Sequence, residues 1–145
     1  MKKMILSVLI IVIFPVGIAN AGPDDRYPLF SDSLKVRNVI FCIGDGMGLA
    51  QIAAARIKTR GAFGRLAMER MPVTGLVNTC SADALITDSG ASGTALAAGI
   101  KTNNSMIGMS PDQEPRTTIL EACRKRGMAT GLVATSTITH ATPAS

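Results

Sequence analysis

The chain has 145 residues and a formal net charge of +5, from 15 basic and 10 acidic side chains, with one tyrosine and four phenylalanines. The basic side chains are scattered and aromatic ones are scarce, so the sequence lacks the stacking surfaces of nucleic-acid-binding proteins, and nucleic acid is not an expected partner. A chain of this length is able to form one domain with its own core.

The first 21 residues predict a signal peptide rather than part of that domain. Two lysines open the sequence, residues 4–18 are apolar and uncharged, and Ala19-Asn20-Ala21 has the small-x-small pattern of a cleavage site. The mature chain is then expected to begin at Gly22 and to be exported, either periplasmic or secreted. The apolar run is short for a membrane span, so no membrane association is expected after signal removal, and a retained anchor is the alternative.

Residues 22–35 are polar and rich in turn formers, which predicts an extended lead-in. The run at residues 39–43 is short, apolar and unalternated, and it predicts a strand buried on both faces of a parallel sheet. Cys42 within this run is expected to be a small buried hydrophobe. Cys80 and Cys123 fit no zinc spacing, and the sequence leaves open whether they pair.

Helices and strands are expected to alternate through the rest of the sequence. Pro72 would halt the second helix, and Gly127 would end the fourth. The expected helices cover residues 48–60, 65–71, 90–98 and 117–126, the further strands cover residues 73–79 and 128–135, and one more helix opens within residues 139–143. This alternation predicts an α/β layered fold around a mainly parallel sheet.

Polar segments follow three of the predicted strands. They are Asp45, the Asp88-Ser89 pair, and residues 140–142. In open α/β sheets, ligands bind beyond the carboxyl ends of the strands. The sequence therefore predicts that these segments meet in one crevice.

Asp45 lies in the turn Gly44-Asp45-Gly46-Met47-Gly48. Such a turn allows close approach of a ligand, and a carboxylate is a hard oxygen ligand for divalent cations. The spacing differs from the G-x-G-x-x-G of dinucleotide-binding folds, and the acidic side chain would repel a phosphate unless a metal ion stood between them. The residues leave two roles open for Asp45, a turn former and a metal ligand.

Ser89 stands where a helix is expected to begin. Asp88 or Ser89 is able to cap this helix, which is the commonest use of such residues. The same helix terminus would also attract a phosphate, placing it near the Ser89 hydroxyl. A serine nucleophile needs activation, yet the chain has one histidine and no G-x-S-x-G elbow, so a metal ion is the remaining activator.

Taken together, these segments closely resemble alkaline phosphatases. Residues 39–48 look like the first metal-binding segment of that family, and residues 86–95 match its nucleophile signature. Three further stretches follow the family order, at residues 99–104, 117–121 and 131–143. Residues 36–145 are thereby identified as the amino-terminal part of an alkaline phosphatase domain.

This resemblance implies a fold and an activity. It implies a three-layer sandwich around a mainly parallel sheet, incomplete in this chain, and a homodimer when the protein is full length. The implied reaction is hydrolysis of small phosphate monoesters through a phosphoserine intermediate. The implied cofactors are two Zn²⁺ and one Mg²⁺ in each complete site.

The resemblance also implies a role for each site residue. Asp45 would bridge the second zinc and the magnesium, and Ser89 would attack phosphorus while bound to that zinc. Asp88 would position groups around the nucleophile, notably an arginine that clamps the phosphate. Thr142 would bind magnesium through its hydroxyl, and His140 falls where the family carries Asp or His, in or just outside the magnesium shell. The plainer alternatives are a helix cap for Thr142 and an exposed polar side chain for His140.

Two other functions compete with this interpretation. A phosphodiesterase or sulfatase of the same broad superfamily would favour a threonine, or a modified cysteine or serine in a different motif, whereas Ser89 points to monoesters. An exported binding protein that kept only the fold is a rival from another class. Both the metal motif and the nucleophile motif are intact, which favours the enzyme.

The first prediction concerns the isolated 145-residue polypeptide, which we expect to have no phosphatase activity. In the resembling family, further histidines, carboxylates and the clamping arginine lie downstream of the nucleophile, whereas this chain holds a single histidine. The measurement is release of p-nitrophenol from p-nitrophenyl phosphate by the purified polypeptide. Release above that of a Ser89→Ala control would contradict the prediction.

Overall fold

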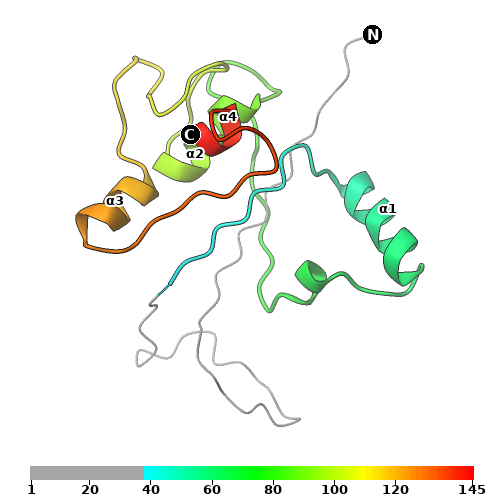
Figure 1. The fold of residues 1–145 in the computed structure, drawn as a ribbon. Helices are drawn as coiled ribbons and strands as arrows, with labels where there is room; N and C mark the ends of the chain where they lie inside the picture. Colours follow the sequence, from blue (N-terminus) through cyan, green and yellow to red (C-terminus); the bar gives the residue numbers. More distant parts are fainter. Residues whose placement is uncertain (1–37) are drawn as a thin grey trace.

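The computed structural model describes residues 38–145, so the predicted signal peptide and lead-in lie outside the described residues. It contains four α-helices and one 3-10 helix (Figure 1). In chain order they are α1 Leu49–Arg60, η1 Ala67–Arg70, α2 Ser89–Ala98, α3 Ile119–Lys125 and α4 Ala141–Ala144. None of these helices combines the length and apolar character that crossing a membrane requires.

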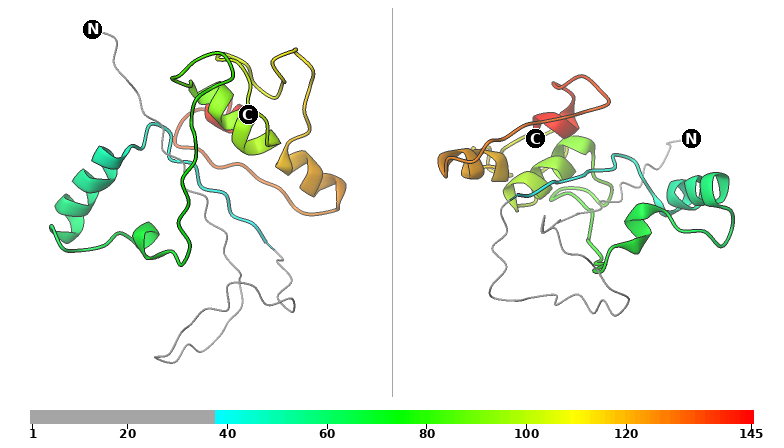
Figure 2. Two further views of the ribbon diagram at one scale, coloured as in Figure 1. Left: turned by 180° about the vertical axis from the view of Figure 1, so that it is seen from behind. Right: turned by 60° about the horizontal axis from the view of Figure 1, so that its bottom comes forward.

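The helices form two groups, which are seen in both views of Figure 2. One group is α2 with α3 and α4 packed against it, and the other is α1 with the neighbouring η1. Extended segments connect the two groups (Figure 1). The site described below lies where the turn before α1 meets α2 and α4.

The predicted strands at residues 39–43, 73–79 and 128–135 are extended segments without a hydrogen-bonded ladder. Across residues 38–145, the only β-pairing is an isolated bridge between Met109 and Pro115. The expected burial on both faces is also wrong here, since the Ile40 side chain is 54% exposed and Cys42 is exposed. A strand gains its hydrogen bonds and its apolar cover from neighbours, and within the described residues no neighbour supplies them.

The helix predictions agree with the structure to within two residues at most ends. Helix α1 begins at Leu49, and the N–H of Gly48 donates to the Gln51 side chain at 3.1 Å. The expected helix at residues 65–71 is instead the single 3-10 turn η1. The Leu66 N–H donates to the Glu69 carboxylate at 2.8 Å. This local hydrogen bond closes a single turn, which agrees with a 3-10 helix of four residues.

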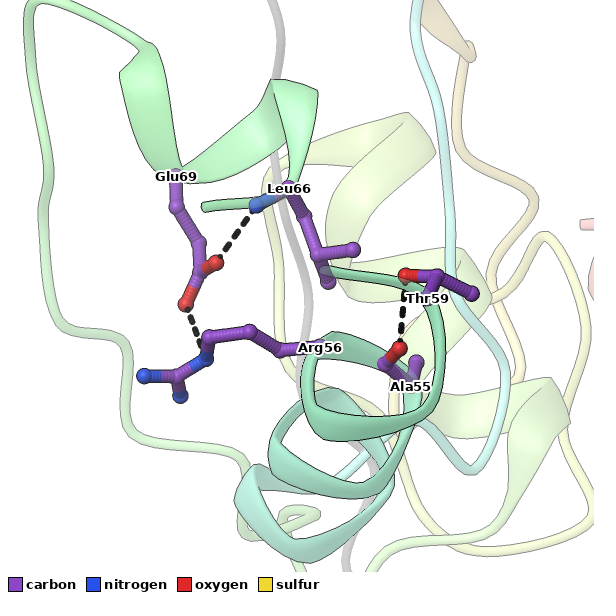
Figure 3. A network of polar contacts seen from close by, with 5 residues as sticks. All are labelled: Ala55, Arg56, Thr59, Leu66 and Glu69. Carbon is purple, nitrogen blue, oxygen red and sulfur yellow. Dashed lines mark hydrogen bonds and ion pairs between the residues drawn. The ribbon is translucent and has the colours of Figure 1, made fainter. Parts of the chain in front are cut away.

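Glu69 also connects η1 to α1 (Figure 3). The Arg56 Nε lies 3.1 Å from the second Glu69 carboxylate oxygen, an ion pair whose angles fall short of a hydrogen bond. On the same helix, the Thr59 hydroxyl donates to the Ala55 carbonyl at 2.7 Å. The Arg56–Glu69 ion pair is the contact that joins η1 to α1, and a partly exposed ion pair of this kind contributes at most about 1 kcal/mol.

Helix α3 is defined by local hydrogen bonds at both ends. At its start, the Thr118 hydroxyl accepts from the Glu121 N–H at 3.2 Å, and Glu121 accepts from the Thr118 N–H at 2.8 Å, a capping box. At its end, the N–H groups of Gly127 and Met128 donate to the carbonyls of Arg124 and Cys123, a Schellman motif. The predicted stop at Gly127 is therefore confirmed.

The core of the described structure is small and lies around α2. Its buried members are Gly90, Ala91, Gly93 and Thr94 of α2, with Ser81, Thr102 and Ser110 from the flanking loops. Small side chains let other segments approach closely: a Cβ on Gly93 would stand 2.7 Å from the Cβ of Ser145. Many large apolar side chains are exposed, among them Leu76 and Val133. Packing of small and polar residues around α2, rather than a large apolar core, holds this part of the chain together.

All three cysteines are free thiols in this structure. The pairing of Cys80 with Cys123 that the sequence left open is therefore absent. Both side chains are half-buried, and the Lys101 ammonium lies 3.0 Å from the Cys80 sulfur.

The second prediction concerns Gly99, which ends α2 in the left-handed conformation with φ +72. A Cβ there would meet no atom within 4 Å, so Gly99→Ala adds backbone strain without a clash. We expect it to lower the free energy of unfolding by about 1 kcal/mol. Urea denaturation of the 145-residue chain, followed by far-ultraviolet circular dichroism, measures the change.

The matched control is Gly131→Ala, where the Cβ also meets nothing within 4 Å and φ is not in the left-handed region. It is expected to leave stability unchanged or raise it slightly, because alanine restricts the unfolded chain. Equal loss in both variants would contradict the prediction.

Candidate active site

The Asp45 carboxylate lies against the Ser89 hydroxyl. The Ser89 Oγ is 3.0 Å from Asp45 Oδ2 and 3.2 Å from Oδ1, and the hydroxyl donates to the carboxylate. Ser89 is half-buried and Asp45 is exposed. Two residues that stand 44 positions apart in the sequence are thus brought together, as the sequence predicted.

Thr142 completes the cluster from the carboxyl-terminal side. Its hydroxyl donates to Asp45 Oδ2 at 2.7 Å, across 97 positions of sequence. Thr142 lies inside α4, whose N-cap position is occupied by His140. The alternative of a helix cap for Thr142 is therefore wrong, and its hydroxyl bonds to the predicted metal-binding carboxylate.

The turn before α1 places Asp45. The Met47 N–H donates to the Gly44 carbonyl at 3.2 Å, and the Gly48 N–H donates to the Gly46 carbonyl at 3.1 Å. Gly46 has φ +68, a left-handed conformation that glycine adopts without strain. Asp45 is thus a turn residue, and its carboxylate also accepts hydrogen bonds from two hydroxyls. Its role as a metal ligand stays a prediction.

Asp88 places Ser89 at the first position of α2. One Asp88 oxygen accepts from the Ala91 N–H at 2.8 Å, which is the bond of an N-cap, and the other accepts from the Ser105 N–H at 2.5 Å. The Ser92 hydroxyl donates to the Asp88 carbonyl at 2.8 Å. Ser89 therefore sits at the positive end of the α2 dipole, where a phosphate anion is favoured.

His140 lies two residues before Thr142, and its side chain is exposed. Its backbone N–H donates to the Thr137 carbonyl at 2.9 Å, and no hydrogen bond joins its imidazole to the described residues Asp45, Ser89 or Thr142. The structure thus brings three of the predicted metal-binding residues into contact, while the His140 side chain stays outside that contact.

The donor set of this cluster consists of hard oxygens. One carboxylate and two hydroxyls suit Mg²⁺ as partial ligands, and a serine oxygen next to a carboxylate is also compatible with Zn²⁺. Within residues 38–145, no group of three or more His, Cys, Asp or Glu side chains stands close enough to hold a metal ion. The residues therefore fit part of a metal shell.

A pocket opens beside Asp45. It is bounded by the turn at residues 43–45, by residues 77–81, and by the face of α2 that carries Ser92 and Leu96. Lys101 lines it too, but its ammonium already donates to the carbonyls of Asn78, 3.2 Å, and Cys80, and to the Cys80 sulfur. The Lys101 ammonium therefore contacts the main chain of the pocket wall.

The prediction from sequence missed Asp83 and Asn104 as members of the site's surroundings. The Asn104 side chain bonds to the main chain on both sides of Thr87, and Asp83 bonds to the Asn104 N–H at 2.9 Å. The signal was present, because residues 99–104 were recognised as following the family order, but nothing in the sequence assigned Asn104 a contact.

The Asn104 N–H and, second, the Ser81 hydroxyl hold the pKa of the Asp83 carboxyl below its ordinary value. Both groups donate hydrogen bonds that stabilise the charged carboxylate. The side chain is exposed, so this local bonding acts in contact with water.

Comparisons with known proteins place this chain in a family. The alkaline phosphatase family matches residues 36–145. Streptomycin-6-phosphate phosphatase of Streptomyces griseus is 45% identical over 120 residues, which are 79% of this chain and 27% of that protein. Alkaline phosphatase 4 of Bacillus subtilis is 44% identical over 119 residues, 78% of this chain and 26% of that protein. The chain therefore belongs to the alkaline phosphatase family, and it spans about a quarter of the length of these curated relatives.

Solved structures agree with this assignment. A cold-active alkaline phosphatase from a psychrophilic Shewanella superimposes with a TM-score of 0.64 and 37% identity, over 69% of this chain and 26% of that one. A second structure is a variant of the alkaline phosphatase from the Antarctic bacterium TAB5, in which a histidine is replaced by aspartate and Mg is bound in the M3 site. It superimposes with a TM-score of 0.60 and 36% identity, over 67% of this chain and 27% of that one. The described part of the chain thus has an alkaline-phosphatase-like fold, without the regular sheet that the sequence predicted.

The third prediction concerns Asp83. Ser81→Ala removes one of the two hydrogen bonds that favour the carboxylate, so the pKa of Asp83 should rise toward its ordinary value. Because the folded-state pKa is depressed, the stabilisation is present above the unfolded value, roughly 3.9, and is lost as the pH falls through the folded pKa. Carbon-13 NMR titration of the Asp83 carboxyl measures the shift.

Ser136→Ala is the control for this titration, because the Ser136 hydroxyl bonds only locally, to the Thr137 carbonyl. It should leave the Asp83 titration unchanged. An unchanged Asp83 pKa in Ser81→Ala would contradict the assignment of its cause.

Proposed function

We propose that the protein hydrolyses small phosphate monoesters by transferring the phosphoryl group to the Ser89 hydroxyl oxygen, at a site holding two Zn²⁺ and one Mg²⁺. The observation that supports this most is the contact of the Asp45 carboxylate with the hydroxyls of Ser89 and Thr142. Membership of the alkaline phosphatase family supports the same chemistry. The proposal is for the whole protein, since the chain spans about a quarter of its relatives.

The residues present fix the nucleophile before reaction. The Ser89 hydroxyl points its hydrogen at Asp45, so a lone pair of its oxygen is left free for phosphorus. The free N–H groups of the first turn of α2 favour the negative phosphate beside it. When bound, the metal ions would supply positive charge that lowers the pKa of the serine hydroxyl and stabilises both the attacking and the leaving oxygen.

In the first step, the Ser89 hydroxyl gives up its proton to solvent, a bond forms between the Ser89 oxygen and phosphorus, the bond from phosphorus to the ester oxygen breaks, and the alcohol leaves with a proton from solvent. In the second step, water attacks the phosphoserine and loses a proton to solvent, the bond from phosphorus to the serine oxygen breaks, the serine oxygen takes up a proton from solvent, and inorganic phosphate leaves. The Ser89 hydroxyl is then restored, and it again donates to Asp45.

The individual ligand roles are part of the same proposal. Asp45 would bridge Zn²⁺ and Mg²⁺, and Thr142 would bind Mg²⁺, which agrees with their common hydrogen bond. His140 is proposed in or just outside the magnesium shell, supported by its place two residues from Thr142. Asp88 is proposed to position an arginine that clamps the phosphate. Its carboxylate oxygens each accept one N–H and keep a lone pair for such a partner.

The remaining proposals concern the protein's surroundings. A relative named streptomycin-6-phosphate phosphatase supports small phosphorylated molecules as the substrate class. We also propose that the three-layer sandwich around a parallel sheet is formed in the whole protein, that it is a homodimer, and that it is exported. Export rests on the sequence of residues 1–21, which lie outside the described residues.

The fourth prediction tests the nucleophile in the protein expressed from the entire reading frame that carries this sequence. Ser89→Ala should lower kcat for p-nitrophenyl phosphate by at least about 10³-fold, because no other group replaces the attacking oxygen. Acid quenching of the native enzyme with substrate, followed by mass spectrometry, should find the phosphoryl group on Ser89.

Ser136→Ala is the control, since the Ser136 hydroxyl is exposed and bonds only locally, to the Thr137 carbonyl. It should keep kcat within about tenfold of the native value. A phosphoryl group on another residue, or a Ser89→Ala enzyme as active as the control, would rule the proposal out.

A further inference from the structure

The loop at residues 102–108 packs along the first turns of α2. The buried Thr102 accepts from the Ala82 N–H through its carbonyl at 2.8 Å, and the Gly108 N–H donates to the Thr94 hydroxyl at 2.9 Å. A Cβ on Gly90 would stand 3.2 Å from the Met106 carbonyl oxygen, so the loop follows the helix closely. This loop therefore packs against Gly90, the residue that follows Ser89.

Asn104 makes the central contacts of this loop. Its Oδ1 accepts from the Asp88 N–H at 3.0 Å, and its Nδ2 donates to the Ile86 carbonyl at 3.0 Å. Its own N–H donates to the Asp83 carboxylate at 2.9 Å. The two side-chain partners, a donor and an acceptor, also fix which way the amide is turned.

Ser105 extends the contact to the Asp88 side chain. Its N–H donates to Asp88 Oδ2 at 2.5 Å, and its backbone is left-handed, with φ +68. A serine in this conformation costs about 1–2 kcal/mol of strain, which the surrounding contacts must offset. Asn104 and Ser105 together thus hold both the main chain and the side chain of Asp88.

We propose that Asn104 is a positioning residue for the Ser89 nucleophile. Its amide fixes the main chain at Ile86 and Asp88, and the turn so fixed aims the Ser89 oxygen at Asp45. The inference rests on the function proposed above and names a residue that acts on that site. Asn104 makes no hydrogen bond to Ser89 or Asp45, so it acts through Asp88.

The chemistry of the amide explains why asparagine serves here. The turn offers one N–H and one carbonyl within reach of a single planar group, and only an amide pairs with both. An aspartate would keep the acceptor but lose the donor and add charge near Asp83 and Asp88. An alanine would leave both main-chain groups without their side-chain partner.

The fifth prediction tests this role in the metal-loaded enzyme from the entire reading frame. Asn104→Ala should lower the rate constant of phosphoserine formation, measured by rapid quench in a single turnover, by about 10–100-fold, since small misplacement of a nucleophile has effects of this size. The inhibition constant of inorganic phosphate should stay within about threefold, because the N–H groups of α2 remain.

Three further variants separate positioning from stability. Asn103→Ala removes the neighbouring asparagine, whose side chain makes no hydrogen bond within the described residues, and should leave the rate within about twofold. Glu69→Ala breaks the ion pair between η1 and α1 and the bond that the Leu66 N–H donates within η1, and it should lower Tm without changing the rate. Asn104→Gln keeps both the donor and the acceptor of the amide on a longer side chain, so its loss should be smaller than that of Asn104→Ala, and it serves if the alanine variant does not fold.

The outcomes are distinguishable. If the native enzyme forms phosphoserine at Ser89 and both Asn104 variants react like Asn103→Ala, the positioning role is overturned while the proposed function stands. The positioning role is also overturned if Asn104→Ala changes only KM. It is overturned as well if Glu69→Ala, with the same Tm as Asn104→Ala, loses as much of the rate of phosphoserine formation. If the native enzyme forms no phosphoserine, the proposed function fails first and the inference fails with it.

Discussion

The site depends on one anionic carboxylate that receives hydroxyl hydrogens from two remote segments. Asp45 enters from the turn before α1, Ser89 from the start of α2 and Thr142 from α4. Asp45 is exposed, so these bonds add little to the stability of the fold in water. Their value is geometric, because they hold the serine oxygen in one orientation before any substrate arrives.

Helix α2 is the scaffold that makes this meeting possible. Its small residues let α4 and the loop at residues 102–108 come within contact of its backbone. Its N-cap Asp88 is itself held from outside by Asn104 and Ser105. A larger side chain at Gly93 would push α4 away and separate Thr142 from Asp45, so the composition of the helix and the geometry of the site are linked.

Many large apolar side chains away from α2 are exposed, whereas several small residues of α2 are buried. Several of the exposed ones, among them Ile40, Leu76 and Val133, lie in the segments whose sequences predicted strands. Their composition suits burial on both faces of a sheet, and it agrees with the three-layer sandwich proposed for the whole protein. Within the described residues, helix capping and the packing of small side chains stabilise the structure in place of a sheet core.

The sequence alone determined where α2 begins and where α3 begins and ends, because these ends are set by neighbours in the chain: the cap at Asp88, the capping box of Thr118 with Glu121, and the stop at Gly127. It also singled out Asp45, Ser89 and Thr142 as site residues. Only the tertiary structure decided that their oxygens touch, that Thr142 lies within α4 rather than capping it, and that Asn104 grips the nucleophile turn. These contacts join residues 16 to 97 positions apart, so no local pattern of side chains encodes them. The hydrogen bonds of the predicted strands also depend on partners distant in sequence, which is why a strand-like pattern alone does not form a sheet.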